Sequence, residues 1–242
     1  MIVIKIPVCD STNKELLKAI ALDKVPSGTV YWTDRQTAGR GRLNRSWESP
    51  EGNIALSVAT KLPDDRATSY QLNLVAALSV SQTLQRRCSA QVQIKWPNDV
   101  LLDGQKCCGV LGEIASLDLA VIGIGINLNC WKRDFSIELQ HQLTTVREKT
   151  KHFIVPERFL TDLLQQLELN FELFRQQGLS AFRQRIYGQL AFRDQPLTVR
   201  DNTGSCYNAR ILGLTDEGFL IVVTESGVIR TLQAEDVQVR GG

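Results

Sequence analysis

Hydrophobic residues recur along the chain with two periods, one typical of strands and one typical of helices. Alternating or continuous apolar runs predict strands at residues 2–6, 29–33, 53–62, 92–96, 100–102, 106–114 and 119–128. Helical spacing predicts helices at residues 64–87, 156–177 and around 179–187. A further helix is expected near residue 12, where Thr12 and Glu15 have capping-box spacing. Asp103 and Gly104 predict a hairpin turn.

Beyond Phe192 the pattern changes to short strands with closely spaced turns, at residues 196–200, 209–214, 219–224 and 228–232. Such a run of about fifty residues predicts a small β-barrel appended to an α+β domain. We therefore expect an α+β fold with a mixed sheet flanked by helices. The expected division is a catalytic domain at residues 1–187 and a small β-domain at residues 188–242.

Charge and cysteine content narrow the class of protein. The 242 residues carry a formal net charge of +2, too small for a protein that coats nucleic acid, so cationic function must come from local clustering. The six cysteines have no Cys-x-x-Cys spacing and no secretory leader precedes them, which predicts free thiols in the cytoplasm. No apolar run approaches the roughly 20 residues of a membrane span, so no membrane role is expected.

The one dense cationic cluster is RQTAGRGRLNRSW at residues 35–47, which we call the arginine loop. Gly39 and Gly41 flank Arg40, so the backbone can approach a ligand closely while guanidinium groups donate to phosphate. Charge alone would favour a solvated surface loop, and it is the order of glycines and arginines that argues for a loop that closes over an anion. A Walker loop is absent, and GIGINL at residue 123 lacks the third glycine of the dinucleotide fingerprint. Nucleotide binding would therefore use another scheme.

A second polar cluster follows the strand at residues 92–96. Pro97 interrupts that strand and places Asn98 and Asp99 at its end, where ligand-orienting groups often lie, with Lys95 before them and Lys106 after. Either lysine alone could simply face water. His141 and His152 lie away from these segments, which argues against Ser-His-Asp catalysis and zinc sites. The vicinal pair Cys107 and Cys108 should point to opposite strand faces and pack ordinarily.

Four segments in order resemble the biotin protein ligases, which attach biotin to a lysine of carboxylase carrier domains: DSTN at residues 10–13, QTAGRGRLNRSW at 36–47, KWPNDVLLDGQKCCGVLGE at 95–113 and GIGINLN at 123–129. The resemblance spans nearly the whole chain. It implies a class II synthetase-like catalytic domain and an SH3-like C-terminal barrel. The chain begins at the catalytic domain, so a monofunctional ligase without a DNA-binding domain is expected. Asn44 replaces the usual glycine, and asparagine tolerates the same left-handed backbone.

The resemblance also implies which residues do the chemistry of joining biotin to ATP and then to a carrier lysine. Lys106 would stabilise charge at the α-phosphate, and Arg40 and Arg42 would close the loop over the adenylate. The implied biotin-binding residues are Ser11, Thr12, Asn13, Gln36, Arg40, Gly41, Lys106, Gly109 and Gly123. Those implied for ATP or the adenylate are Arg40, Arg42, Trp47, Lys95, Asn98, Asp99 and Asn127. Thr12 could instead cap a helix, and Trp47 could be a core residue.

The implied cofactor is ATP with Mg²⁺ carried by its phosphates, and no protein ligand to the metal is assigned. The implied partners are biotin and the biotin carboxyl carrier protein of acetyl-CoA carboxylase, with no DNA and a monomer or homodimer. Three alternatives stay open: a lipoate ligase of the same superfamily, a nucleic-acid-binding regulator that uses the arginine loop, and a non-catalytic biotin sensor.

Overall fold

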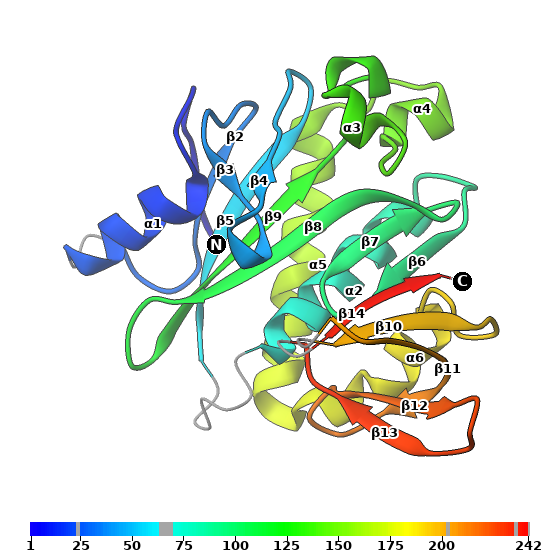
Figure 1. Ribbon diagram of the computed structural model, residues 1–242. Coiled ribbons are helices and arrows are strands. Elements are labelled where there is room, and N and C mark those ends of the chain that lie inside the picture. Colours follow the sequence, from blue (N-terminus) through cyan, green and yellow to red (C-terminus); the bar gives the residue numbers. More distant parts are fainter. Residues whose placement is uncertain (23–24, 63–69, 202–203, 235–236, 242) are drawn as a thin grey trace.

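A seven-stranded mixed sheet forms the larger part of the molecule. The computed structural model describes residues 1–22, 25–62, 70–201, 204–234 and 237–241 (Figure 1). The strand order is β1-β2-β5-β9-β8-β7-β6, with β1 parallel to β2 and every other neighbouring pair antiparallel. The strands are β1 (Ile2–Lys5), β2 (Thr29–Thr33), β5 (Ile54–Lys61), β6 (Val92–Lys95), β7 (Asp99–Leu102), β8 (Gln105–Ile114) and β9 (Leu119–Ile126). The expected mixed sheet is thereby confirmed.

Helices cover both faces of this sheet. Val58 and Ile122 belong to the main core, together with α2 (Gln71–Gln85) and α5 (Pro156–Gln177). Their chain neighbours Ala59 and Val121 pack instead with α1 (Thr12–Ala21). Successive strand residues point to opposite faces, so α1 lies on the face opposite to α2 and α5. The α1 face is the one that carries the cleft described below.

The long helices follow their sequence patterns with some differences. Proline at the start and Gly178 at the end bound α5 as expected. The described part of the helix expected at residues 64–87 is α2, which begins at Gln71; residues 64–69 of that expected helix lie outside the described residues. The expected helix at 179–187 divides into η4 (Leu179–Ala181) and α6 (Arg183–Gln189), with the buried Phe182 between them. Thr12 is not a cap: Ser11 occupies the N-cap without a side-chain bond, and the Thr12 hydroxyl contacts other groups.

The chain after residue 192 forms the expected antiparallel sheet. Its strands are β10 (Leu197–Asp201), β11 (Cys206–Leu214), β12 (Leu220–Thr224), β13 (Ile229–Leu232) and β14 (Val237–Gly241), in the order β13-β12-β11-β10-β14. Closure into a barrel stays a prediction. This sheet packs on the larger part: Trp96 Nε1 donates to Gly218 O at 3.0 Å, and the Tyr70 and Phe219 rings stack. The two parts therefore share one continuous core.

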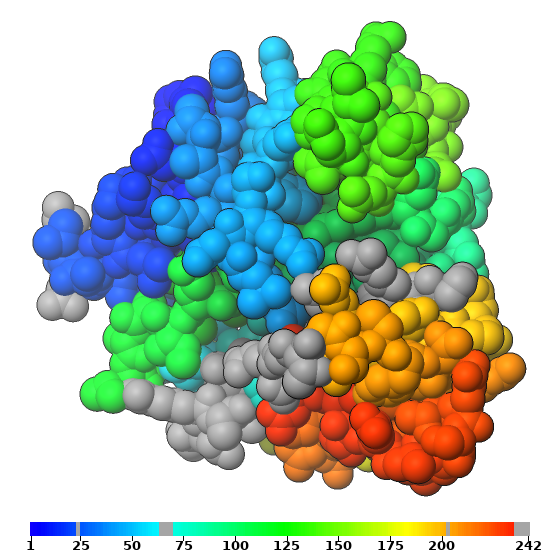
Figure 2. All heavy atoms as spheres, in the orientation of Figure 1, coloured from blue at the N-terminus to red at the C-terminus, as the bar shows by residue number. Residues whose placement is uncertain are grey.

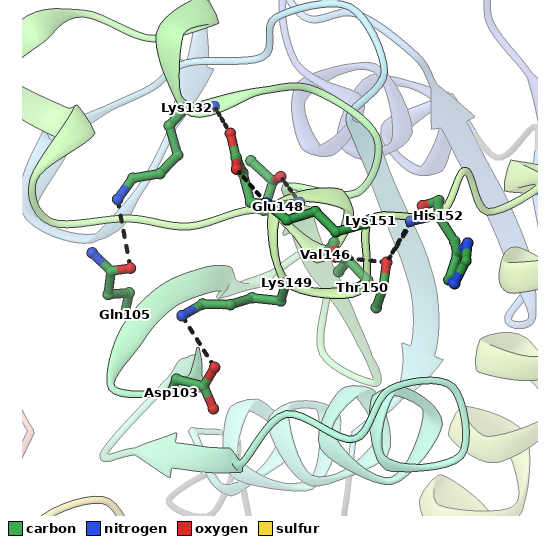
Figure 3. Close-up of polar contacts among 10 residues, drawn as sticks. Asp103, Gln105, Lys132, Val146, Glu148, Lys149, Thr150, Lys151 and His152 are labelled. Atoms are coloured by element: carbon green, nitrogen blue, oxygen red, sulfur yellow. Dashed lines mark hydrogen bonds and ion pairs between the residues drawn. The ribbon is translucent and has the colours of Figure 1, made fainter.

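The segment between β9 and α5 contains short elements that the sequence pattern does not predict: η3 (Lys132–Asp134), α3 (Ile137–Gln140) and α4 (Val146–Thr150). Asp103 and Gly104 form the expected turn between β7 and β8, and both have positive φ. Lys149 pairs with Asp103 at 3.1 Å, and Lys132 Nζ lies 3.5 Å from Gln105 Oε1 (Figure 3). These contacts hold the segment against the β7–β8 hairpin. None of the helices in the described ranges is long and apolar enough to cross a membrane.

Candidate active site

A cleft of about 1040 Å³ opens on the α1 face of the sheet. Its walls come from the start of α1, the arginine loop, the β6–β7 turn, β8, β9 and the segment at residues 135–143. Figure 2 shows the arginine loop, in light blue, beside the green α3 segment and above the orange C-terminal sheet. Every sequence-predicted site residue lines this cleft: Ser11, Thr12, Asn13, Gln36, Arg40, Gly41, Arg42, Trp47, Lys95, Asn98, Asp99, Lys106, Gly109, Gly123 and Asn127.

Alternate glycines on β9 leave room at the floor of the cleft. A Cβ built on Gly123 would overlap the side chain of Asn13, and one on Gly125 would overlap the ring of Trp47. Ile122 and Ile124, which precede these two glycines, point to the opposite face and join the main core. The GIGIN sequence therefore gives β9 an apolar side that packs on α2 and a bare side that admits groups from the cleft.

Trp47 lies across this floor. Its ring centroid is 5.5 Å from Lys106 Nζ, and its Nε1 is buried without a hydrogen-bond partner in the part of the chain that the structure describes. Trp47 belongs to none of the apolar clusters that form the core. Of the two interpretations open from the sequence, its position in the cleft therefore favours a ligand-contacting role over core packing.

Lys106 is fixed through both its side chain and its backbone. Its Nζ lies 2.8 Å from Asp99 Oδ1, and about a third of its side chain is exposed to the cleft. The Lys106 N–H donates to Gln142 O and its carbonyl accepts from Thr144 N–H, so the segment after β9 braces β8 at this residue. The result is an ammonium group held at the cleft surface beside an aromatic face.

The arginine loop is a small hairpin in which β3 (Gly39–Arg40) pairs with β4 (Ser46–Trp47). Leu43 and Asn44 between them have φ of 55° and 56°, so asparagine takes the glycine-like backbone expected of it, and an exposed leucine does the same. Both residues lie in the short 3₁₀ turn η1 (Arg42–Asn44). The loop therefore has the left-handed turn that the sequence analysis expected despite the absent glycine.

Arg42 links three parts of the chain. Its guanidinium donates to Asn98 Oδ1 at 3.2 Å and to the main-chain carbonyl of Ala234 at 2.6 Å. Asn98 in turn donates to Val110 O at 2.8 Å, which fixes the orientation of its amide. Asn98 therefore positions Arg42, in addition to lining the cleft.

A polar network joins α1 to the sheet at the other end of the cleft. Thr12 N–H donates to Gln36 Oε1 at 2.8 Å, and Asn13 Nδ2 donates to Glu113 Oε2 at 2.6 Å. The fully buried Ser57 hydroxyl lies between Thr12 and Asn13. Sequence reasoning missed Ser57, which has no motif around it, and it quoted Glu113 only as the end of a motif. Periodicity placed Ser57 on the predicted strand at residues 53–62, but it gave no sign that this residue lies beside α1.

Asn127 plays a structural part that the sequence does not reveal. It is almost fully buried, donates to Thr144 O at 3.2 Å and accepts from Asn53 Nδ2 at 3.3 Å. Asn53 was not predicted as a site residue. Because Thr144 also contacts the backbone of Lys106, this pair of asparagines helps to place the lysine strand.

Cysteine and histidine chemistry have no place in the cleft. Burial raises the pKa of the Cys107 and Cys108 thiols well above the usual range, so both stay neutral and pack as apolar groups. His141 and His152 are not among the residues that line the cleft. No group of three or more His, Cys, Asp or Glu side chains that would hold a metal ion occurs in the described ranges. The cleft thus offers cations and hydrogen-bonding groups.

The sequence is similar to known proteins over nearly its whole length. The profile described as "Biotin/lipoate A/B protein ligase family" matches residues 5–127, and "Biotin protein ligase C terminal domain" matches residues 194–240. A "Biotin--[acetyl-CoA-carboxylase] ligase" of Paracoccus denitrificans is 33% identical over 90% of this chain and 92% of its own. A "Bifunctional ligase/repressor BirA" of Bacillus spizizenii is 30% identical over 93% of this chain and 70% of its own.

A solved structure agrees with this fold. The biotin protein ligase from Aquifex aeolicus, in complex with biotin and ATP, superimposes with a TM-score of 0.87 at 30% sequence identity. The match covers 100% of this chain and 99% of that one.

Proposed function

The chain belongs to the biotin/lipoate A/B protein ligase family, and we propose that it is an ATP-dependent biotin ligase. It would activate biotin as biotinyl-5'-adenylate and transfer the biotinyl group to a lysine of a carrier protein. The observation that carries this proposal is the cleft itself, in which cationic, carboxylate and amide groups from distant segments gather around a glycine floor. Relatives named as biotin ligases support biotin over lipoate as the acid.

In the first half-reaction a biotin carboxylate oxygen forms a bond to the α-phosphorus of ATP, and pyrophosphate leaves. Two anions must meet, so a fixed cation is needed where they meet. We assign this role to Lys106, whose ammonium group is held by Asp99 at the cleft surface. The described residues offer no cluster that would hold magnesium, so Mg²⁺ would enter with the phosphates of ATP, where it supplies charge neutralisation.

In the second half-reaction the amine of the carrier lysine attacks the acyl carbon of the adenylate, AMP leaves and a proton is lost from nitrogen. The mixed anhydride must be shielded from water until that attack. Arg40 and Arg42 on the arginine loop are assigned to hold the adenylate phosphate and keep the loop closed. Trp47, Lys95, Asn98, Asp99 and Asn127 are assigned to the nucleotide part of the cleft, and Ser11, Thr12, Asn13, Gln36, Gly41, Gly109 and Gly123 to biotin.

Three further assignments complete the proposal. The carrier is that of acetyl-CoA carboxylase, as the name of the Paracoccus relative indicates. The catalytic part comprises residues 1–187, and the C-terminal part, residues 188–242, closes into an SH3-like barrel. No nucleic-acid role is proposed, since the arginine loop lines the cleft.

Biotin-dependent exchange of labelled pyrophosphate into ATP tests the first half-reaction. The exchange should require biotin, and lipoate offered at the same concentration should give none. Folded protein that exchanges with lipoate and not with biotin would replace the proposal by a lipoate ligase. Folded protein that binds biotin and ATP but exchanges with neither acid would point to a sensor.

A further inference from the structure

The side-chain amide of Asn13 has only one possible orientation. Its nitrogen lies 2.6 Å from Glu113 Oε2 and 3.2 Å from the carbonyl of Leu111. A carboxylate and a carbonyl only accept hydrogen bonds, so both amide hydrogens are donated to them. Asn13 Oδ1 must therefore face the opposite side, where Ser57 lies.

Hydrogen counting extends this constraint to the Ser57 hydroxyl. Ser57 Oγ lies 2.5 Å from Asn13 Oδ1 and 2.7 Å from Thr12 Oγ1, and it has one hydrogen for the two contacts. Asn13 Oδ1 has no hydrogen to give, so Ser57 donates to it. The Thr12 hydroxyl has two acceptors within reach, Ser57 Oγ at 2.7 Å and Gln36 Oε1 at 3.2 Å. Because the Ser57 hydrogen is already used, the shorter contact needs the Thr12 hydrogen, which is then not donated to Gln36.

This order of bonds fixes what the cleft offers to a ligand. With its hydrogen donated to Ser57, Thr12 Oγ1 presents lone pairs alone. Gln36 Oε1, 3.2 Å from Thr12 Oγ1, is turned the same way because the Thr12 backbone N–H donates to it. Two neighbouring oxygen acceptors thus line the cleft, and a polar group that enters must bring its own N–H or O–H donors.

We propose that Ser57, together with Glu113, is a positioning residue that makes Thr12 a hydrogen-bond acceptor and so selects an acid whose ring carries N–H donors. The inference rests on the proposed biotin ligase function. The cyclic urea of biotin has two N–H groups, whereas the dithiolane ring of lipoate has none. Ser57 is not among the residues that line the cleft and acts through Thr12 and Asn13. The Ser57 hydroxyl would therefore help the enzyme to discriminate biotin from lipoate without contacting either acid.

The experiment pairs the Ser57→Ala variant with a lactam analogue of biotin in which one ureido N–H is replaced by CH₂. The apparent KM of each acid is measured by pyrophosphate exchange, and binding to the enzyme by calorimetry. In the wild type we expect the lactam to bind about 10- to 100-fold more weakly, because an acceptor is left unpaired. Without Ser57 the Thr12 hydroxyl can donate to Gln36 Oε1 instead, which pairs that acceptor, so the lactam penalty should fall to about threefold or less.

Two more measurements distinguish a role of Ser57 in orienting the Thr12 hydroxyl from a general loosening of the core. In Ser57→Ala the KM for biotin should rise about 10-fold or more while kcat at saturating biotin stays close to wild type. The matched control is Ser79→Ala, since Ser79 is equally buried but lies on α2 and donates to Val75 O. Its lactam penalty should equal that of the wild type. A reduced penalty in Ser79→Ala would show that any buried serine acts this way and would overturn the proposal.

Glu113→Gln tests the same chain of hydrogen bonds without a change in the core, because Glu113 is exposed. A glutamine at this position can donate as well as accept, which allows the Asn13 amide to turn over. We expect Glu113→Gln to weaken binding of the lactam relative to biotin by a factor between those of wild type and Ser57→Ala. A factor equal to that of wild type would show that Glu113 does not help to orient Asn13, Ser57 and Thr12. If the lactam binds more weakly than biotin by the same factor in wild type and in Ser57→Ala, the proposed role of Ser57 is overturned. Absence of biotin-dependent exchange in the wild type would instead overturn the proposed function.

Discussion

The ammonium group of Lys106 on β8 meets the carboxylate of Asp99 on the neighbouring strand β7, with 2.8 Å between Nζ and Oδ1. Only a fifth of the Asp99 side chain and a third of the Lys106 side chain are exposed. The pair therefore sits where water is partly excluded and where a second anion would compete with Asp99 for the lysine. The same ammonium lies 5.5 Å from the centroid of the Trp47 ring, and all three residues line the cleft.

Replacing Lys106 should slow adenylate formation more than replacing Asp99 does. Lys106→Ala removes the cation assigned to the α-phosphate, and a fall in exchange rate of about 100-fold or more is expected. Asp99→Asn keeps the cation but loosens its position, with an expected fall of about 10-fold. Initial rates of pyrophosphate exchange at saturating biotin and ATP measure both. Full carrier biotinylation by Lys106→Ala would refute the assignment.

Arg42→Gly should release the adenylate faster. The variant loses the charge-assisted contact assigned to the phosphate, worth on the order of 1.5–3 kcal/mol, and also the bonds to Asn98 and Ala234. The off-rate of biotinyl-adenylate, followed by rapid dilution, should rise about 10- to 100-fold. Arg35→Ala is the control, since Arg35 is exposed and does not line the cleft. An unchanged off-rate in Arg42→Gly would remove this arginine from the role.

Gly125→Ala should damage the cleft without a change in charge. The added Cβ overlaps the Trp47 ring, so the tryptophan must move, at a cost of about 1–3 kcal/mol. We expect a raised KM for ATP, because Trp47 is assigned to the nucleotide, together with lower thermal stability. Gly213→Ala on β11, where a Cβ meets nothing within 4 Å, should change neither quantity. Identical kinetics in the two variants would contradict the role of the glycine floor.

The buried vicinal thiols should make stability fall at alkaline pH. Burial raises the pKa of Cys107 and Cys108 in the folded protein above the ordinary 9.0, so the unfolded chain ionises first as pH rises. The unfolded state then binds fewer protons, and the free energy of unfolding decreases above about pH 9. Urea unfolding at pH 7, 9 and 10 measures this slope. A Cys107→Ala/Cys108→Ala variant should have a shallower slope; an equal one would assign the effect to other groups.

Alkylation gives an independent check on the same thiols. In the folded protein at pH 8, iodoacetamide should label the exposed Cys206 and leave Cys107 and Cys108 unmodified. Peptide mass spectrometry before and after denaturation compares the sites. Rapid labelling of Cys107 in the native protein would contradict its burial.

The sequence predicted those parts of the fold that depend on local pattern. The strands around the arginine loop, the Asp103 and Gly104 turn and helix α5 all follow from periodicity and turn residues, and the structure confirms them. The short helices α3 and α4 were missed because four or five residues are too few for a period to register. Thr12 was misassigned as a possible cap, because its hydroxyl is used by residues distant in sequence.

The candidate site likewise contains residues that could be predicted from local sequence and residues that could not. Residues inside recognisable motifs, such as Gln36 and Lys106, could be selected from the sequence, and they do line one cleft. Ser57 and Asn53 could not, because their importance depends on which residue of another strand or helix lies opposite them. Register and packing supply that information, and neither is visible in a single sequence. The chemical role of each site residue stays a prediction.

The contact from Arg42 to the Ala234 carbonyl predicts a coupling between ligand binding at the cleft and the folding of the C-terminal sheet. The acceptor lies 192 positions along the chain from its donor, just after β13. A ligand that binds Arg42 would also stabilise the end of the sheet that accepts its hydrogen bond. Conversely, unfolding of the sheet would remove that acceptor and leave Arg42 less well positioned. By linkage, occupancy of the cleft should raise the melting temperature of a sheet that does not itself line most of the cleft.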